Sequence, residues 1–510
     1  MENGFNRLKV KMLDIVSERC VAILNVKDAS ELGVRQQDRV RIMGKRGEIV
    51  ALVETTSSLV PPGEVGLVQN AYEKMELADP EEEVVVVPAE KPTSVDYIKK
   101  KLDGQPLSSE EIFAIVNDIV KRNLSDIELT AYVSGVYING MNMDETVALT
   151  RAMVETGETI SFDRGPIYDF HSIGGVPGNK ITLLVVPIVA AAGLMIPKTC
   201  SRAISSACGT ADIFEVLAPV SLTIHQIKQI TETVGGVIAW GGAVNMAPAD
   251  DLIIRVEYPL GIDPHAQLLA SVMAKKKAVG SERLAIDIPM GPGTKVPDYA
   301  TARTFARDFI TLGEHLGMKV ECAITYGGQP VGRAIGPAAE AREALAALEG
   351  KPSPNSLIEK AVGMASILLS MDGRSNSRGL AMEILKSGKA LAKMKEIIEA
   401  QGGNPDVTSD DVPIGKYTYE YTAKRDGYVK GISNRAMVKI TRAAGAPKDK
   451  GAAVILRVKE GDAIDPGDVL FTIHADNRKK LQDAVDIARK TDPIKVEGMI
   501  IEKVPAIHEM

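Results

Sequence analysis

The stretch that decides the fold runs from residue 166 to residue 182 and reads PIYDFHSIGGVPGNKIT. It begins as a buried strand, turns through several glycines and leads into the apolar segment Ile181–Ile196. Glycines let the backbone approach a ligand closely, and the N–H groups at a helix start attract anions. The stretch therefore predicts a strand, an anion-binding loop and a buried helix, although a tight turn without a ligand fits the same pattern.

A second strand, loop and helix follow at once. Residues 196–215 read IPKTCSRAISSACGTADIFE, and a helix is expected near Ala211–Leu217. Hydroxyl groups crowd this loop around Arg202, which suits phosphate oxygens because they accept several charge-assisted hydrogen bonds. A serine-rich turn that caps a helix is the structural alternative. Two such loops in one sheet predict two phosphate groups, or a phosphate and a sugar.

Strands and helices go on alternating beyond these loops. Buried strands are expected in GGVIAWGG, residues 235–242, and in RLAIDIP, residues 283–289. Alternation of this kind indicates a central α/β domain with a mostly parallel sheet. We place that domain at residues 161–345 and assign phosphate and nucleotide binding to it.

Helices precede this domain near residues 109–122, 126–138 and 143–156. Each begins with a Ser or Asn that is followed three residues later by Glu, which is the spacing of a capping box. They define a helical domain over residues 93–160, completed by later helices. Before it, short alternating apolar runs predict a small barrel-like β domain over residues 1–88, with PAEKPTS as the linker.

The chain beyond the α/β domain is divided into a helical connection, residues 346–400, and a β-rich α+β domain, residues 401–510. Within the latter, VKEGDAIDPGDVLFTIHAD, residues 458–476, resembles the hairpins of barrel-sandwich hybrid domains such as lipoyl carriers. No lysine stands between apolar partners at a hairpin tip. We therefore predict a scaffold and not a carrier.

The composition limits the classes of function. The 510 residues are 45% hydrophobic and 25% charged, and the net charge of −7 lacks the basic clusters of nucleic-acid-binding proteins. Two lysine runs, Lys99–Lys101 and Lys275–Lys277, are interpreted as solvated helix ends. The four scattered cysteines indicate a cytoplasmic protein without disulfides. Isolated histidines predict no metal site, and no apolar segment reaches the ~20 residues of a membrane span.

The second loop carries a specific resemblance to a known family. It is similar to the signature R-x-x-x-x-x-x-G-T-x-D-x-x-E of the thymidine and pyrimidine-nucleoside phosphorylases, and DFHSIGGV resembles that family's D-K-H-S-T-G-G-V. The likeness covers about residues 93–500 and implies a pentosyltransferase that cleaves an N-glycosidic bond with inorganic phosphate. The matching positions are Arg202, Gly209, Thr210, Asp212 and Glu215 in the signature, and Arg255, Ser271 and Lys275 for base binding.

Departures from this pattern resemble one branch of the family. Phe170 stands where the family has a lysine that contacts phosphate, and a β domain precedes the helical domain. The segments GIDPH, residues 261–265, and GPGTKVP, residues 291–297, are further features of this kind. The set resembles the archaeal-type branch that converts a nucleoside 5′-monophosphate such as AMP, with inorganic phosphate, to free base and ribose 1,5-bisphosphate. The branch implies no cofactor and a homodimer, or a larger homo-oligomer.

The resemblance also implies the site residues. Asp263 matches the residue that donates a proton to the leaving base. The substrate-binding positions match Gly175, Ser201, Arg202, Ala203, Ile204, Ser205, Ser206, Thr210, Ser271 and Lys295.

Several of these residues have a structural alternative. Asp263 precedes Pro264, a preferred first residue of a helix, so a capping role is the alternative to acid catalysis. Ser271 and Lys275 lie four apart, which fits joint contact with a base or an ordinary polar face. Lys295 is harder to explain structurally, because an exposed lysine needs no flanking glycines.

Three other functions remain open. A pyrimidine-nucleoside phosphorylase shares the chemistry but takes no 5′-phosphate. A phosphoribosyltransferase of the same fold, such as the anthranilate enzyme, needs acidic residues beside a GTGGD-like loop, which CGTAD at residues 208–212 matches poorly. A non-enzymatic assembly protein would have no need of both anion loops and Lys295.

Overall fold

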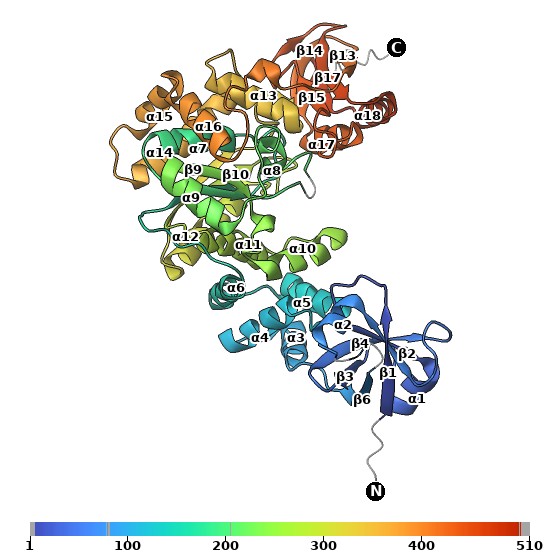
Figure 1. Ribbon diagram of the computed structural model, residues 1–510. Helices are drawn as coiled ribbons and strands as arrows, with labels where there is room; N and C mark the ends of the chain where they lie inside the picture. The colour runs from blue at the N-terminus through green and yellow to red at the C-terminus, as the bar shows by residue number, and fades with distance from the viewer. Residues whose placement is uncertain (1–5, 78, 80–81, 204–205, 499, 501–510) are drawn as a thin grey trace, which may run out of the picture. The chain divides into compact units, whose positions relative to one another are not determined.

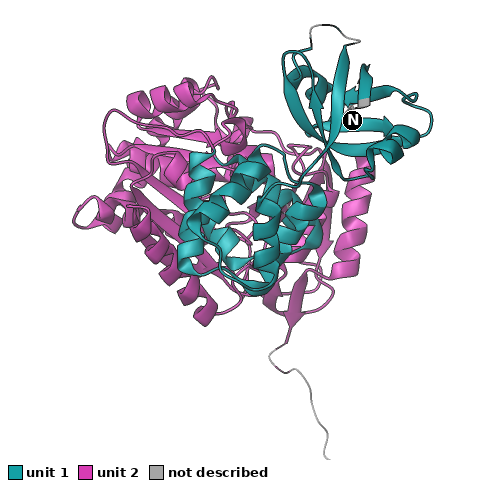
Figure 2. Cartoon of the chain, turned by 90° about the horizontal axis from the view of Figure 1, so that it is seen from below, with its two compact units in different colours: residues 1–156, 247–271 teal, residues 157–246, 272–510 magenta. Residues whose placement is uncertain are grey.

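The computed structural model describes residues 6–77, 79, 82–203, 206–498 and 500. The chain divides into two compact units (Figure 2). The first unit contains residues 1–156 and 247–271, and the second contains residues 157–246 and 272–510. Residues 247–271 therefore share a unit with the residues of the predicted helical domain, whose bounds stay a prediction.

The N-terminal strands of the first unit form a closed barrel (Figure 1, blue). Alternating residues point into it, so Val10, Val40 and Val86 are fully or almost fully buried. The barrel-like β domain predicted from the sequence is confirmed. Around the barrel the strand order is β1-β5-β2-β4-β3-β6, and the elements are β1 (Asn6–Leu13), β2 (Val21–Asn25), α1 (Val26–Leu32), β3 (Arg39–Met43), β4 (Glu48–Thr56), β5 (Glu64–Val68), α2 (Gln69–Lys74) and β6 (Glu83–Ala89).

A helical bundle follows the barrel within the same unit. Ser108, Ser125 and Asn142 each accept a hydrogen bond from the third residue of their helix, whose glutamate returns one to the cap. The three predicted capping boxes are therefore present, and they fix where the helices begin. The bundle consists of α3 (Ser94–Leu102), α4 (Ser109–Val120), α5 (Asp126–Asn139) and α6 (Met143–Glu155), and α10 (Pro248–Leu260) packs on α4 and α5.

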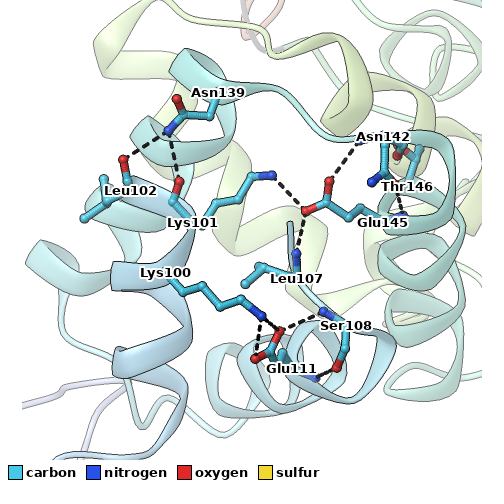
Figure 3. A network of polar contacts seen from close by, with 10 residues as sticks. All are labelled: Lys100, Lys101, Leu102, Leu107, Ser108, Glu111, Asn139, Asn142, Glu145 and Thr146. Carbon is cyan, nitrogen blue, oxygen red and sulfur yellow. Dashed lines mark hydrogen bonds and ion pairs between the residues drawn. The ribbon is translucent and has the colours of Figure 1, made fainter. Parts of the chain in front are cut away.

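The two lysine runs are only partly solvated, which corrects their interpretation as solvated helix ends. Lys101 is 3% exposed, and its ammonium lies 2.8 Å from the Glu145 carboxylate, which also accepts a hydrogen bond from the Leu107 amide (Figure 3). Lys276 in the other run is 1% exposed. Carboxylates that are distant in sequence make this burial possible, because a buried charge needs a partner.

Ion pairs tie the barrel to the helical bundle. The guanidinium of Arg39 on β3 forms two hydrogen bonds, of 3.0 and 2.6 Å, with the Glu128 carboxylate of α5 and a third with the Asn123 carbonyl. Its side chain is 3% exposed. Glu18, in the turn after β1, lies 2.7 Å from Arg122 at the bundle surface. The barrel is thus anchored through a buried, bidentate contact and not through the linker alone.

We expect the chain to remain folded when residues 1–90 are deleted, a cut that removes β6 with the rest of the closed barrel. The barrel has its own apolar core, so the deletion should leave the remaining units cooperatively folded. Circular dichroism and thermal unfolding of the truncated chain test this. Arg39→Met in the full chain is the matched control, because it removes the Glu128 contact and keeps the barrel. Global unfolding of the truncated chain would contradict the expectation.

The second unit contains the predicted parallel strands. β7 (Tyr168–Ser172), β10 (Arg283–Met290) and β11 (Lys319–Tyr326) form a parallel sheet in the order β11-β10-β7. β8 (Ile196–Cys200) and β9 (Gly236–Trp240) form a second parallel pair, joined to β7 by a parallel bridge between Ile167 and Met195. Because β7 and β8 run in the same direction, their carboxyl ends lie at one edge. Both predicted anion loops leave from that edge.

Helices cover these strands. α7 (Thr182–Ala191) is buried all round, as the apolar segment predicts, and lies in the largest apolar cluster of the unit. No helix in the described part of the chain has the length and apolar character needed to cross a bilayer. The other helices are α8 (Thr210–Phe214), α9 (Ile224–Val234), the 3-10 turn η1 (Gly241–Ala243), α11 (His265–Ala278, which begins in the first unit), α12 (Tyr299–His315), α13 (Pro337–Leu348), α14 (Asn355–Met371), α15 (Ser377–Lys386) and α16 (Lys389–Ala400).

The C-terminal part of the second unit is an α+β region with two antiparallel sheets (Figure 1, orange to red). One sheet includes β12 (Ala334–Ile335), which lies within the predicted central domain. A strand of two residues is too short to be recognised in the sequence. The bounds of the five predicted domains stay predictions. The sheet orders are β12-β15-β17-β13 and β16-β14-β18, formed by β13 (Tyr417–Thr422), β14 (Gly427–Ile432), β15 (Ala453–Leu456), β16 (Ala463–Ile464), β17 (Val469–Ala475) and β18 (Ile494–Glu497), with η2 (Ser409–Asp411), α17 (Asn434–Ala443) and α18 (Arg478–Thr491).

Candidate active site

The first predicted loop leaves β7 at Ser172. The Asn179 amide, at the far end of the loop, donates a hydrogen bond of 3.0 Å to the Ser172 hydroxyl. The same amide lies 3.4 Å from the Asp287 carboxylate on β10, which Lys360 of α14 also contacts at 2.9 Å. The loop is therefore closed on itself and pinned to the neighbouring strand. This holds its backbone at the carboxyl edge of the sheet.

Gly175 brings this loop against the segment that contains Lys295. Its φ is +90°, and a Cβ placed on it would lie 2.9 Å from the backbone nitrogen of Lys295 and 3.1 Å from the Thr294 Cα. Only glycine tolerates both the left-handed backbone and that approach. Two predicted site residues thus lie side by side, with the Lys295 side chain exposed. The packing of the loop therefore requires a glycine at position 175 whether or not a ligand binds there.

The second predicted loop is held by its own signature residues. The Asp212 carboxylate accepts hydrogen bonds from the Ala203 amide at 2.8 Å and the Gly209 amide at 2.9 Å. A Cβ on Gly209 would lie 2.3 Å from the Ser201 carbonyl oxygen, so the loop doubles back tightly at this point. The signature therefore specifies the shape of the loop. Thr210 then begins α8.

Arg202 is already paired within this loop. Its guanidinium contacts Glu215 through hydrogen bonds of 2.8 and 2.5 Å and stands over the Trp240 ring. The hydrogen bonds from Arg202, with help from the Lys450 ammonium, lower the pKa of Glu215 to about 2. Two hydrogen bonds to one carboxylate favour a structural role for this side chain. Contact of Arg202 with a substrate stays a prediction.

The structure describes only some of the other predicted site residues in this loop. Ser201 is exposed, and Ser206 is half-buried with its hydroxyl 3.1 Å from the Cys208 carbonyl. Ile204 and Ser205 lie outside the described residues.

A buried charge cluster lies behind the two loops. The Asp169 carboxylate on β7 is fully buried and lies 2.8 Å from the Lys276 ammonium and 3.8 Å from the Lys198 ammonium. Lys198, on β8, also donates a hydrogen bond to the Phe170 carbonyl and lies 4.5 Å from the centre of the Phe170 ring. Lys276 donates to the Thr199 carbonyl at 3.1 Å. The cluster joins β7, β8 and α11 with two cationic side chains and one carboxylate.

His171 stands at the end of β7 in a strongly electropositive place. Burial lowers the pKa of its imidazole well below the usual range, and the charges of four lysines lower it further. His171 is therefore neutral near neutral pH. The arrangement gathers positive charge at the strand ends, which is where an anionic substrate would be held. The four lysines are Lys198, Lys276, Lys275 and Lys295.

The first unit carries the other predicted residues. Asp263 is exposed, and α11 begins at His265, so Pro264 lies just before the helix and not at its first position as predicted. The Ser271 hydroxyl donates a hydrogen bond of 2.8 Å to the buried Asp250 carboxylate. Arg255, matched to a base-binding residue, lies 2.6 Å from the Glu18 carboxylate of the N-terminal barrel segment.

A surface pocket lies at the opposite ends of the same strands. Its lining includes Pro166 and Tyr168 at the start of β7, Met195 before β8 and Gly235 before β9. It is therefore separate from the carboxyl edge at which both anion loops begin.

Family models match most of the chain. A glycosyl transferase family helical bundle domain matches residues 95–157, and the α/β domain of that family matches residues 164–391. A pyrimidine nucleoside phosphorylase C-terminal domain matches residues 428–495. A model described as a molydopterin dinucleotide binding domain matches residues 4–95, which include the closed barrel.

Similar proteins decide the family. The chain is 53% identical to an AMP phosphorylase of Methanosarcina acetivorans, over 98% of this chain and 99% of the relative. The chain belongs to the AMP phosphorylase family. Other members are AMP phosphorylase 1 of Archaeoglobus fulgidus, 54% identical over 95% of this chain and 96% of the relative, and that of Thermococcus kodakarensis, 52% identical over 98% and 99%.

A solved structure shares the fold of this AMP phosphorylase family member. Anthranilate phosphoribosyltransferase from Thermus thermophilus matches with a TM-score of 0.51 and 19% identity, over 60% of this chain and 99% of that one. At that identity the likeness shows the fold alone. The membership confirms the family resemblance and its nucleotide-specific branch.

Sequence reasoning missed the charge cluster. In the sequence, Asp169 stands within the motif DFHSIGGV and Lys276 within a lysine run, and neither pattern indicates a buried charge. A signal for Lys198 does exist, because a lone lysine in the apolar strand IPKTC needs a buried partner or a function. The sequence could not show that the partner is Asp169 on another strand.

Proposed function

We propose that this chain cleaves AMP, and other nucleoside 5′-monophosphates, with inorganic phosphate to give the free base and ribose 1,5-bisphosphate. The observation that carries the proposal is identity above 50%, over 95–98% of the chain, to curated AMP phosphorylases. The enzyme is a pentosyltransferase, since the bond from the ribose C1′ passes from the base nitrogen to a phosphate oxygen.

The chemistry explains the need for positive charge at the strand ends. In the transition state of phosphorolysis the ribose becomes cationic and the departing base becomes anionic, while an anionic nucleophile approaches C1′. The backbone amides of the two loops would position the phosphate groups, and the lysines around His171 would offset their charge. Holding both reactants in line removes much of the entropic barrier.

Individual roles complete the proposal. Ser271 and Lys275, four residues apart on α11, would contact the base. Asp263 would protonate the base as it leaves. Gly175 and residues 201–206, with Thr210, would bind the phosphate groups of the nucleotide and of the nucleophile.

A comparison of substrates tests the function. AMP, adenosine and thymidine are each incubated with the chain, with and without inorganic phosphate, and release of the base is followed by chromatography. We expect phosphate-dependent release from AMP and much slower release from both nucleosides. Equal turnover of AMP and adenosine would contradict nucleotide specificity, and a preference for thymidine would favour the pyrimidine-nucleoside phosphorylase.

Lys295→Ala should reduce kcat/KM for AMP about 10- to 100-fold, the usual loss for one charge-assisted hydrogen bond to a phosphate. Residual activity on adenosine should change little, because adenosine lacks the 5′-phosphate. Lys430→Ala is the control, since Lys430 is an exposed lysine of the same unit that pairs with Glu497 on β18. Equal losses for AMP and adenosine would show that Lys295 does not recognise the 5′-phosphate.

A further inference from the structure

The buried cluster behind the anion loops is not balanced in charge. Lys198 and Lys276 are 4% and 1% exposed, and both turn towards the single carboxylate of Asp169, which is 0% exposed. Lys276 lies closer to that carboxylate, at 2.8 Å against 3.8 Å for Lys198. If both lysines are protonated, the cluster carries one positive charge more than its carboxylate offsets. Burying such a charge is costly.

The position of Lys198 relates this charge to the anion loops. Lys198 lies two residues before the end of β8, and the second loop begins at Ser201. Its ammonium donates to the carbonyl of Phe170, which is followed by His171 and Ser172 at the end of β7. The charge therefore lies behind the point where both loops leave the sheet.

The ring of Phe170 lies against the Lys198 ammonium. Phe170, on β7, is 1% exposed. The Lys198 ammonium lies 4.5 Å from the centre of that phenylalanine ring. The Lys198 cation of β8 is thus held against β7, the strand from which the first loop leaves.

We propose that Lys198 is a positioning residue of the phosphate site, and that it gains a proton from solvent when an anion binds at the loops. The inference rests on the proposed function for the identity of that anion. Lys198 acts through its charge and through the β7 backbone, without a bond to the substrate.

The electrostatics of the cluster support this linkage. Burial and the neighbouring Lys276 charge lower the pKa of Lys198 to about 7, against the opposing effect of Asp169. Two other titratable groups face it. His171 has a pKa well below its usual range, and burial raises the pKa of the Cys200 thiol to about 12, so both stay neutral near pH 8. A bound anion favours the charged form of Lys198 and raises its pKa again.

Titration calorimetry of the full native chain measures the linkage. Sulfate is the probe, because it mimics phosphate and does not titrate near neutral pH. Binding is measured in buffers of different ionisation enthalpy, so that the buffer heat reports the protons taken up. We expect uptake approaching one proton per chain at about pH 8, where Lys198 is mostly neutral, and little at about pH 6, where it already carries its proton.

Three variants locate the proton. Lys198→Met should abolish the uptake and weaken sulfate and phosphate binding about 10- to 100-fold. Lys198→Arg keeps a permanent charge, so it should bind without uptake. Adding Phe170→Lys to Lys198→Met supplies a cation from the neighbouring position on β7 and should restore much of the affinity. Lys459→Met is the matched control, because burial lowers the pKa of Lys459 to about 8 in another part of the same unit.

The outcomes separate this inference from the proposed function. Sulfate or phosphate binding without proton uptake at about pH 8, no binding of either anion, or native uptake by folded Lys198→Met overturns the role of Lys198. If Lys198→Met does not fold, Lys198→Arg takes its place in the test. Proton uptake by Lys198→Arg at the native level would overturn the role of Lys198. If AMP is cleaved without uptake, only this inference fails. If uptake occurs and no nucleotide is cleaved, the proposed function fails and the linked charge stands.

Discussion

Asp263→Asn should lower the turnover of AMP by about 10²–10⁴-fold, the usual contribution of general acid catalysis. An amide cannot deliver a proton to the leaving base. Asp263 is exposed and lies two residues before α11, so the midpoint of thermal unfolding and the Kd for AMP should stay near native. Steady-state kinetics, calorimetric scans and equilibrium binding measure the three quantities on one preparation.

Two comparisons make this result specific. Asp144→Asn changes another exposed acidic residue at the start of a helix in the same unit and should leave turnover unchanged. A nucleotide whose base leaves without protonation should lose least with Asp263→Asn, because its transition state needs less help. Turnover of AMP within a few-fold of native would show that Asp263 is not the general acid. Loss of the fold would mean that the site is structural.

Asp169→Asn should cost about 3–5 kcal/mol of folding free energy, the usual effect of leaving a buried charge without its partner. Asp169 is fully buried and offsets Lys276 and Lys198. The loss should be largest near pH 6 and smaller near pH 9, since Lys198, with its pKa lowered to about 7, can shed its charge within the folded chain. Urea unfolding at the two pH values measures it.

The free energy of unfolding of the native chain should also rise with pH, but by a smaller amount. The folded pKa of Lys198 lies below its ordinary value of 10.5, so the unfolded state binds more protons between the two values. This group therefore makes the chain more stable as the pH rises from about 7 to 10.5. Asp372→Asn is the control for Asp169→Asn, because Asp372 accepts a hydrogen bond from Tyr168 near the surface. If the Asp169→Asn variant has the same urea midpoint of unfolding as the native chain, the predicted loss of stability is wrong.

Local patterns predicted the elements well because their causes are local. Ser108, Ser125 and Asn142 start helices through bonds to residues three positions away. The strand-loop-helix order at 166–182 and 196–215 follows from apolar runs that end at glycines. The same holds for Gly209, whose conformation is set by a loop that lies within the signature.

Long-range partners could not be predicted. Lys101 and Lys276 are buried only because Glu145 and Asp169 reach them, and no spacing rule connects residues so far apart. The sequence also does not identify Glu215 as the partner of Arg202. A loop arginine beside serines could bind a phosphate as well as a carboxylate. Site residues inferred from the family therefore need the experiments given above.

The most direct test of the central claim is the product balance with AMP. The native chain, AMP and inorganic phosphate are incubated, and adenine, ribose 1,5-bisphosphate and consumed phosphate are quantified together. We expect equal amounts of all three and no adenine release when phosphate is omitted. Adenine accompanied by ribose 5-phosphate would mean that water is the nucleophile, and release that does not depend on phosphate would contradict phosphorolysis.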